Sequence, residues 1–165
     1  MEPSRITEIL RDPVTRDLTD RQPIGQIAYA AADGSPRVVP LGYLLREDRF
    51  VFFTVPGSDK VAALRRDPRI ALSVDTYPPP CCLLVRGTAE LREEPGVPEE
   101  YLEASYRTMP AEQHAGFAAQ VRSLYDSMVR ITVTPTWVRL NDFQRTAPRA
   151  VERLVAAKRA GGAAV

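Results

Sequence analysis

Residues 33–76 decide the fold: they read DGSPRVVPLGYLL over 33–45 and RFVFFTVPGSDKVAALRRDPRIALSVDT over 49–76. The dipeptide Asp33-Gly34 favours a tight hairpin turn, so it predicts that a strand at 24–32 pairs with a strand at 37–45. The apolar runs 50–55 and 70–74 indicate two further strands, and the residues between them, 58–66, indicate a short helix. The stretch therefore predicts antiparallel strands interrupted by one helix.

The start of that helix carries the residues that suggest a binding site. Ser58 is a candidate N-cap and Lys60 lies in the first turn, while Arg37 follows the hairpin turn. A helix start presents unpaired N–H groups and the positive end of the helix dipole, which suit a phosphate. We therefore expect Arg37, Ser58 and Lys60 to form an anion site. The alternative is an ordinary capped surface helix with a solvated lysine.

The rest of the chain extends the same pattern. A helix is expected at 4–11, a strand at 81–91 with a bulge at Gly87, helices at 101–109 and 117–128, an alternating strand at 129–140 and a helical tail at 148–160. Pro135 interrupts the alternating stretch, so we expect two pieces or an edge strand there. Six or seven strands joined by tight turns, with helices inserted, predict an antiparallel barrel. The whole chain, 1–165, reads as one domain with its core at about 18–140.

Composition narrows the range of functions. The 165 residues are 44% hydrophobic and 26% charged, as in ordinary globular proteins, and the net charge of +1 provides no basic field for nucleic acid. There is no apolar run of membrane-spanning length and no signal peptide, so we expect a cytoplasmic protein. The adjacent Cys81 and Cys82 suit neither a disulfide with each other nor a zinc site, and no metal is expected.

The sequence contains no motif for catalysis by the protein's own side chains. It lacks G-x-G-x-x-G, P-loop, G-x-S-x-G and H-E-x-x-H patterns, and its only histidine, His114, lies in a polar helical stretch where a solvated ring is expected.

The succession IGQIAYAAADGSPRVVPLGYLL, FVFFTVPGSDKVAALRRDPRIALSVD and LLVRGTAEL resembles the split β-barrel flavin-binding proteins related to pyridoxamine 5'-phosphate oxidase. The resemblance covers residues 18–140 and is strongest to small proteins of high-G+C, actinobacterial type that bind FMN or the deazaflavin coenzyme F420. An Arg- and Ala-rich, Lys-poor composition fits such a source. The resemblance implies an oxidoreductase that transfers a hydride between F420, which is favoured, or FMN and a small conjugated substrate. A non-catalytic FMN- or F420-binding carrier, or a haem- or tetrapyrrole-handling relative, is the alternative.

The resemblance also implies which residues form the site. The strand residues Arg37, Val38, Val39 and Pro40 would run along the ring system, and Thr54, Ser58 and Lys60 would hold the phosphate with help from Arg37. The family is generally homodimeric with cofactor sites at the interface, so Tyr77, Pro80 and Trp137 would cover the ring from the partner chain. For Trp137, a place in the core of the last strand is the alternative. A proton donor, if one is needed, would be Tyr43, Tyr77 or solvent.

At two places the sequence departs from the family pattern, which limits how far the family's residue roles apply to this chain. After Trp137 the chain reads VRLNDFQRTAP and contains no histidine, so vitamin B6 chemistry is not expected. Ser58 stands where many relatives have a basic residue, which implies a weaker hold on the phosphate or a different tail.

Overall fold

The computed structural model describes residues 1–145, 147 and 149–162. Its helices are α1 (Pro3–Arg11), α2 (Pro13–Arg21), α3 (Asp59–Arg66), α4 (Glu99–Tyr106), α5 (His114–Leu124) and α6 (Arg149–Gly162), with a short 3-10 turn η1 (Ala111–Gln113) before α5. Its strands are β1 (Ile24–Ala30), β2 (Pro36–Arg46), β3 (Arg49–Thr54), β4 (Arg69–Thr76), β5 (Cys81–Pro95) and β6 (Ser127–Asp142).

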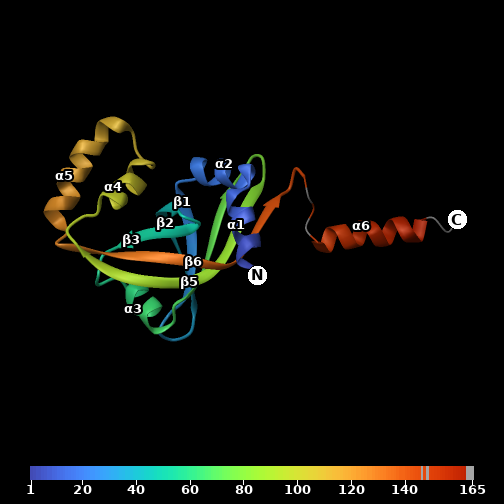
Figure 1. Ribbon diagram of the computed structural model, residues 1–165, viewed down its shortest axis with the longest axis horizontal. Coiled ribbons are helices and arrows are strands. Elements are labelled where there is room, and N and C mark those ends of the chain that lie inside the picture. The colour runs from blue at the N-terminus through green and yellow to red at the C-terminus, as the bar shows by residue number, and fades with distance from the viewer. Residues whose placement is uncertain (146, 148, 163–165) are drawn as a thin grey trace.

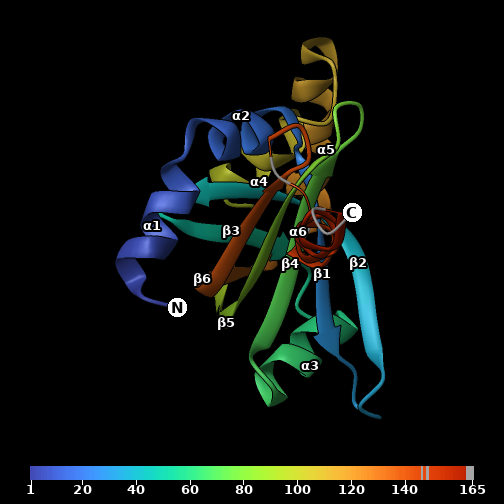
Figure 2. The same ribbon diagram turned by 90° about the vertical axis from the view of Figure 1, so that its right-hand side faces the viewer.

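The six strands close into an antiparallel barrel in the order β1-β2-β3-β6-β5-β4 (Figures 1 and 2). The predicted hairpin joins β1 to β2, with Gly34 at a φ of 81° in its turn. A second tight turn joins β2 to β3, where Glu47 and Asp48 both have positive φ. The predicted antiparallel barrel is confirmed.

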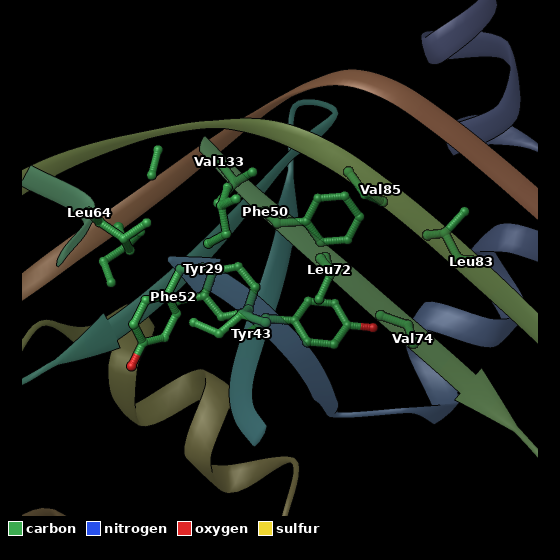
Figure 3. Close-up of a cluster of buried hydrophobic side chains, with 14 of the residues drawn as sticks. Tyr29, Tyr43, Phe50, Phe52, Leu64, Leu72, Val74, Leu83, Val85 and Val133 are labelled. Carbon is green, nitrogen blue, oxygen red and sulfur yellow. The ribbon is translucent and has the colours of Figure 1, made fainter. Parts of the chain in front are cut away.

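The barrel interior is filled by large apolar side chains that alternate with outward residues along each strand (Figure 3). Tyr43, Phe50 and Phe52 are fully buried at its centre, and tilted aromatic contacts at 5.7 and 6.0 Å join Tyr43 to the two phenylalanines. This alternation produced the predicted strands.

Helices cover both ends and one side of the barrel. Helices α1 and α2 add Ile6, Leu10 and Leu18 to the core, and α3 lies at the opposite end from α2 (Figure 2). The outer face of β3 is covered by the chain itself, because Val51 and Phe53 pack against residues around α4. Both faces of this strand are therefore buried within one chain.

Helix α2 is absent from the sequence-based prediction. Pro13, expected only to end the first helix, stands at the start of a second one, whose N-cap Asp12 accepts a 2.8 Å hydrogen bond from the Val14 N–H. An N-cap aspartate followed by proline is a helix-start signal as well as a stop. The same sequence thus ends α1 and begins α2.

The prediction of a broken or edge strand at Pro135 is wrong, because β6 is one strand of sixteen residues that pairs with both β3 and β5. Pro135 is buried opposite Gly87, where the β5–β6 register shifts. A proline lacks the N–H that a regular ladder requires, and the bulge removes that requirement. The predicted bulge at Gly87 is confirmed. Met128, expected at the end of a helix, lies instead at the start of β6.

Helix α6 extends away from the barrel (Figure 1). It contains the predicted Val151, Leu154 and Val155, all exposed, whereas Pro148 lies outside the described residues. In the described part of the chain, no helix combines the length and apolar character needed to span a membrane.

Candidate functional site

Three of the predicted phosphate-site residues meet at the end of β3 and the start of α3. Lys60 Nζ donates to Thr54 Oγ1 at 3.2 Å, and Thr54 Oγ1 donates to Ser58 Oγ at 3.2 Å. Thr54 is buried, whereas Ser58 and Lys60 are half-buried. The structure therefore brings one ammonium and two hydroxyl groups together.

The turn between β3 and α3 explains why Ser58 faces Thr54. Ser58 N–H donates to the Val55 carbonyl at 3.2 Å, and the Ser58 backbone is extended, as an N-cap requires. Its hydroxyl makes no capping bond, although the sequence suggested one. The N–H groups of the first turn of α3 consequently receive no side-chain acceptor from Ser58.

Charge at this position favours an anionic ligand. Lys60 is held by Thr54 rather than freely solvated, and no carboxylate in the described part of the chain pairs with it. An unneutralised cation beside two hydroxyls and a helix start is a donor set that fits a phosphate. Of the described residues, no group of three His, Cys, Asp or Glu side chains is arranged to hold a metal ion.

The first half of β2 presents a flat apolar face. Val38 is 64% exposed and Pro40 is exposed, while Val39 between them packs against the core. Val38 pairs with Ala28 on β1, and Ala28 pairs with Ala71 on β4. Because the side chains of Ala28 and Ala71 are small, they leave space on this face along which a planar ring could lie.

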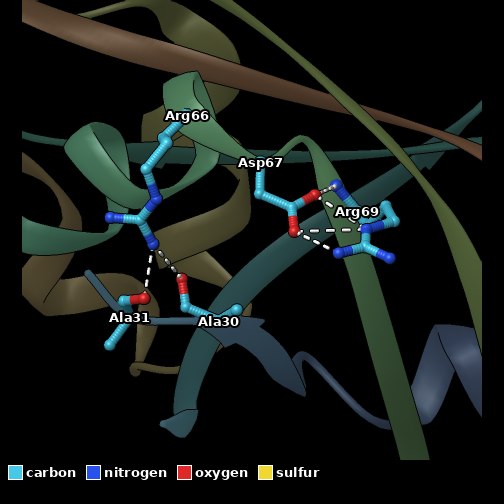
Figure 4. Close-up of polar contacts among 5 residues, drawn as sticks. All are labelled: Ala30, Ala31, Arg66, Asp67 and Arg69. Carbon is cyan, nitrogen blue, oxygen red and sulfur yellow. Dashed lines mark hydrogen bonds and ion pairs between the residues drawn. The ribbon is translucent and has the colours of Figure 1, made fainter. Parts of the chain in front are cut away.

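Arg37 lies apart from the Thr54 cluster within one chain. Arg66, at the C-terminal end of α3, donates to the carbonyls of Ala30 and Ala31 in the adjoining hairpin (Figure 4). Ala30 pairs with Pro36, so Arg37 lies near that end of α3, whereas Ser58 and Lys60 stand at its start. A ligand in contact with all three would have to extend alongside the helix.

The phenol of Tyr43 lies inside the protein. Its side chain is fully buried, its hydroxyl donates to the Thr19 carbonyl at 3.3 Å, and burial raises its pKa above the usual value. Arg107 donates to the same Thr19 carbonyl and to the Tyr43 carbonyl, at 2.6 and 2.9 Å. Tyr43 thus has a structural position away from the candidate phosphate site.

Tyr77, Pro80 and Trp137 do not approach the Thr54 cluster in the same chain. Tyr77, 83% exposed, and Pro80 lie in the turn after β4, whose other end adjoins α3, roughly 20 Å away along the strand. Trp137 is half-buried on the outer face of β6, outside the core, and lies eight residues along that strand from Val129, the residue that pairs with Thr54. Within one chain, these residues therefore do not reach the site.

Arg86 is a neighbour of Trp137 that the sequence did not single out. It pairs with Trp137 across β5 and β6, and its guanidinium carbon stands 4.4 Å from the centroid of the indole. The predicted bulge at Gly87 is the sequence feature that bears on this contact, because the register shift there sets which residue of β6 lies opposite Arg86.

His114 and the two cysteines occupy structural positions. His114 is half-buried rather than solvated: its ring stacks on Tyr106 at 3.9 Å, and its Nε2 lies 3.3 Å from the Met109 carbonyl. Both cysteines are free thiols, and burial raises the pKa of the Cys81 thiol.

Comparisons with known proteins agree with the fold. A family profile described as pyridoxamine 5'-phosphate oxidase matches residues 12–142, and no curated protein sequence matches the chain. A conserved hypothetical protein of Mycobacterium tuberculosis is 22% identical with a TM-score of 0.58, covering 86% of this chain and 85% of the other. An F420 reductase is 24% identical with a TM-score of 0.58, covering 75% and 94%. The haem storage protein HutZ of Vibrio cholerae is 12% identical with a TM-score of 0.57, covering 78% and 92%. At these identities the structural likenesses establish the fold alone.

Proposed function

The chain belongs to the pyridoxamine 5'-phosphate oxidase family, and from that premise we propose that it is an oxidoreductase that uses F420 or FMN. F420 is the favoured cofactor, and the substrate is a small conjugated organic molecule. The observation that carries the proposal is the contact of Lys60 and Ser58 with Thr54 at the start of α3.

The residues of this chain bind and orient the cofactor. Lys60 and the two hydroxyls would hold its phosphate, because hydrogen bonds to a charged group contribute about 1.5–3 kcal/mol each. The face formed by Val38 and Pro40 would support the ring, and Arg37 would reach the part of the ligand that passes along α3.

When bound, the flavin or deazaflavin supplies the hydride chemistry. The surrounding apolar face excludes water from the ring, and solvent or the exposed Tyr77 hydroxyl provides a proton where one is needed. Tyr43 is left out of this role because its hydroxyl is buried against the Thr19 carbonyl.

We propose that the site is completed by a second copy of the chain. Tyr77, Pro80 and Trp137 would then cover the ring from the partner subunit. Their distance from the Thr54 cluster within one chain supports this assignment over a site built by one subunit.

A non-catalytic carrier of F420 or FMN would use the same residues, and turnover distinguishes it from the enzyme. A haem-handling role, suggested by the likeness to HutZ, is less well supported. The only imidazole, that of His114, is already stacked on Tyr106 and directed at the Met109 carbonyl.

The test is a titration of the purified protein with F420 and with FMN side by side, followed by cofactor fluorescence and by melting temperature. We expect micromolar or tighter binding of at least one cofactor, with F420 favoured. If neither signal changes at a large excess of either cofactor, the proposed function is wrong. The visible spectrum of the protein as purified separates flavin, deazaflavin and haem.

A further inference from the structure

A groove of about 660 Å³ crosses the outer face of β4, β5 and β6, on the side of the barrel that carries Trp137. Its lining includes Arg69, Ala71, Arg86 and Trp137, together with Met1, whose N-terminal ammonium donates to the Thr136 carbonyl at 3.3 Å. A volume of this size falls within the range of small-molecule sites, roughly 300–1,000 Å³. The small side chain of Ala71 between the longer ones leaves room for a planar ligand.

Glycine at position 87 is required by the strand contact beneath the groove. A Cβ atom there would lie 2.5 Å from the Thr134 carbonyl oxygen and 2.9 Å from Val133 Cγ1. The same bulge sets Trp137 opposite Arg86. The bulge thus fixes the position of Trp137 in the groove, whereas the missing side chain of Gly87 faces the barrel interior.

Arg86 provides a cation with free donors. Its guanidinium stacks over the Trp137 ring, which leaves the N–H groups at its edge available for a ligand. No carboxylate within the described residues pairs with Arg86, and no aspartate or glutamate lines the groove. Arg69, a second cation of the groove, is already bound to Asp67 through contacts of 2.6 to 3.1 Å (Figure 4), and the N-terminal ammonium of Met1 donates to the Thr136 carbonyl.

We propose that this groove binds a planar aromatic carboxylate. The ring would lie over Ala71 beside Trp137, and the carboxylate would accept hydrogen bonds from the edge of the Arg86 guanidinium. A planar guanidinium matches the two oxygens of a carboxylate in a two-bond geometry that a neutral carboxamide, with one acceptor oxygen, cannot form. The binding of such a ligand does not depend on the proposed function. Its assignment as the substrate does, because Trp137 would then also cover the cofactor of the partner subunit.

The single tryptophan makes the groove directly observable. Titration of the ¹⁵N-labelled protein with 2-naphthoate, followed by the one indole N–H resonance, should give a saturable shift. The neutral analogue 2-naphthamide should bind at least about ten-fold more weakly, as expected for loss of a charged hydrogen bond. Arg86→Gln should raise the dissociation constant of 2-naphthoate by roughly ten-fold and change that of 2-naphthamide by less than about two-fold.

Arg92→Gln is the matched control. Arg92 lies on the same strand, roughly 20 Å from Arg86, is exposed, and makes no polar contact within the described chain, so its loss should leave both affinities unchanged. Equal binding of the two naphthyl compounds, equal losses for the two arginine variants, or no saturable shift would each overturn the proposal. Naphthoate binding by a protein that fails to bind F420 or FMN would contradict the proposed function and leave this inference standing.

Discussion

At the scale of single residues, Lys60 is the group on which the proposed phosphate site depends. Lys60→Ala should cost roughly 1.5–3 kcal/mol of cofactor binding, about ten- to a hundred-fold in affinity, because it removes the ammonium that contacts Thr54 beside Ser58. Unfolding free energy should barely change, since a cation in a first helical turn lies unfavourably against the dipole. Cofactor titration and urea unfolding of the same variant measure both effects.

Arg65→Ala is the matched control for Lys60→Ala. It removes the same charge from the same helix, and Arg65 is exposed and makes no polar contact in the described part of the chain. Arg66 is unsuitable for this purpose because it binds the Ala30 and Ala31 carbonyls and so ties α3 to the hairpin. Equal losses of affinity in Lys60→Ala and Arg65→Ala would indicate general electrostatics rather than a phosphate site.

The ion pair between Asp67 and Arg69 predicts a dependence of stability on pH. Hydrogen bonds from Arg69 lower the pKa of Asp67 to about 2, below its unfolded value near 4. The stabilisation from this lowered pKa is therefore present above about pH 4 and is lost as the pH falls toward 2. Asp67→Asn should unfold at lower urea concentrations than the unmodified protein at pH 6. The gap should narrow between pH 4 and 2, and a gap that stays constant there would contradict this assignment.

At the scale of elements, the close contact of β5 and β6 at the bulge requires a residue without a side chain at position 87, and this requirement can be tested. Gly87→Ala should destabilise the fold by about 1–3 kcal/mol, because its Cβ would collide with the Thr134 carbonyl and backbone must move. Gly57→Ala is the control, since nothing lies within 4 Å of a Cβ built there. Urea unfolding of both variants provides the measurement. A Gly87→Ala protein as stable as the control would mean that the strands can separate at the bulge without cost.

The elements that the sequence predicts well are those whose signal is local. The apolar runs of β1 to β5 and the Asp33-Gly34 turn each arise from residues that are neighbours in the chain. The prediction at Pro135 was wrong because a missing N–H is tolerated where the register of the facing strands shifts. That shift depends on residues far apart in the chain. Helix α2 was missed although Asp12 and Pro13 carried its start signal, because its apolar positions are few.

In the candidate site, too, the parts with a local signal were predicted and the parts that depend on long-range contacts were not. Thr54, Ser58 and Lys60 are close in sequence, and the structure brings them together as expected. The buried position of Tyr43 and the stacking of Arg86 on Trp137 depend on residues far apart in the chain. Local sequence therefore predicts the phosphate cluster, whereas the remaining parts of the site require the assembled barrel.

At the scale of the whole molecule, the basis for expecting a dimer changes. The strand FVFFTV is apolar on both faces, as a strand that contacts a partner chain would be, yet its outer side chains, Val51 and Phe53, are covered by the chain's own residues around α4. Exposed apolar groups remain elsewhere: Val38 on β2, and Val151, Leu154 and Val155 on the projecting helix α6 (Figure 1). These surfaces, rather than β3, are where a second copy would gain burial.

We therefore expect the 18.3 kDa chain to sediment as a homodimer, and Val38→Glu to weaken that dimer. A carboxylate placed at an apolar contact loses its hydration without gaining a partner, so the monomer should become favoured. Leu124→Glu on α5 is the matched control, because Leu124 and Val38 are both 64% exposed and only Val38 adjoins the proposed cofactor face. Sedimentation velocity over a range of concentrations, with and without F420, measures the outcome. A monomer at every concentration with cofactor present, or equal weakening of the dimer by the two variants, would refute an interface at β2. A monomer would also exclude the proposed covering role of Tyr77, Pro80 and Trp137, because these residues do not reach the Thr54 cluster within one chain.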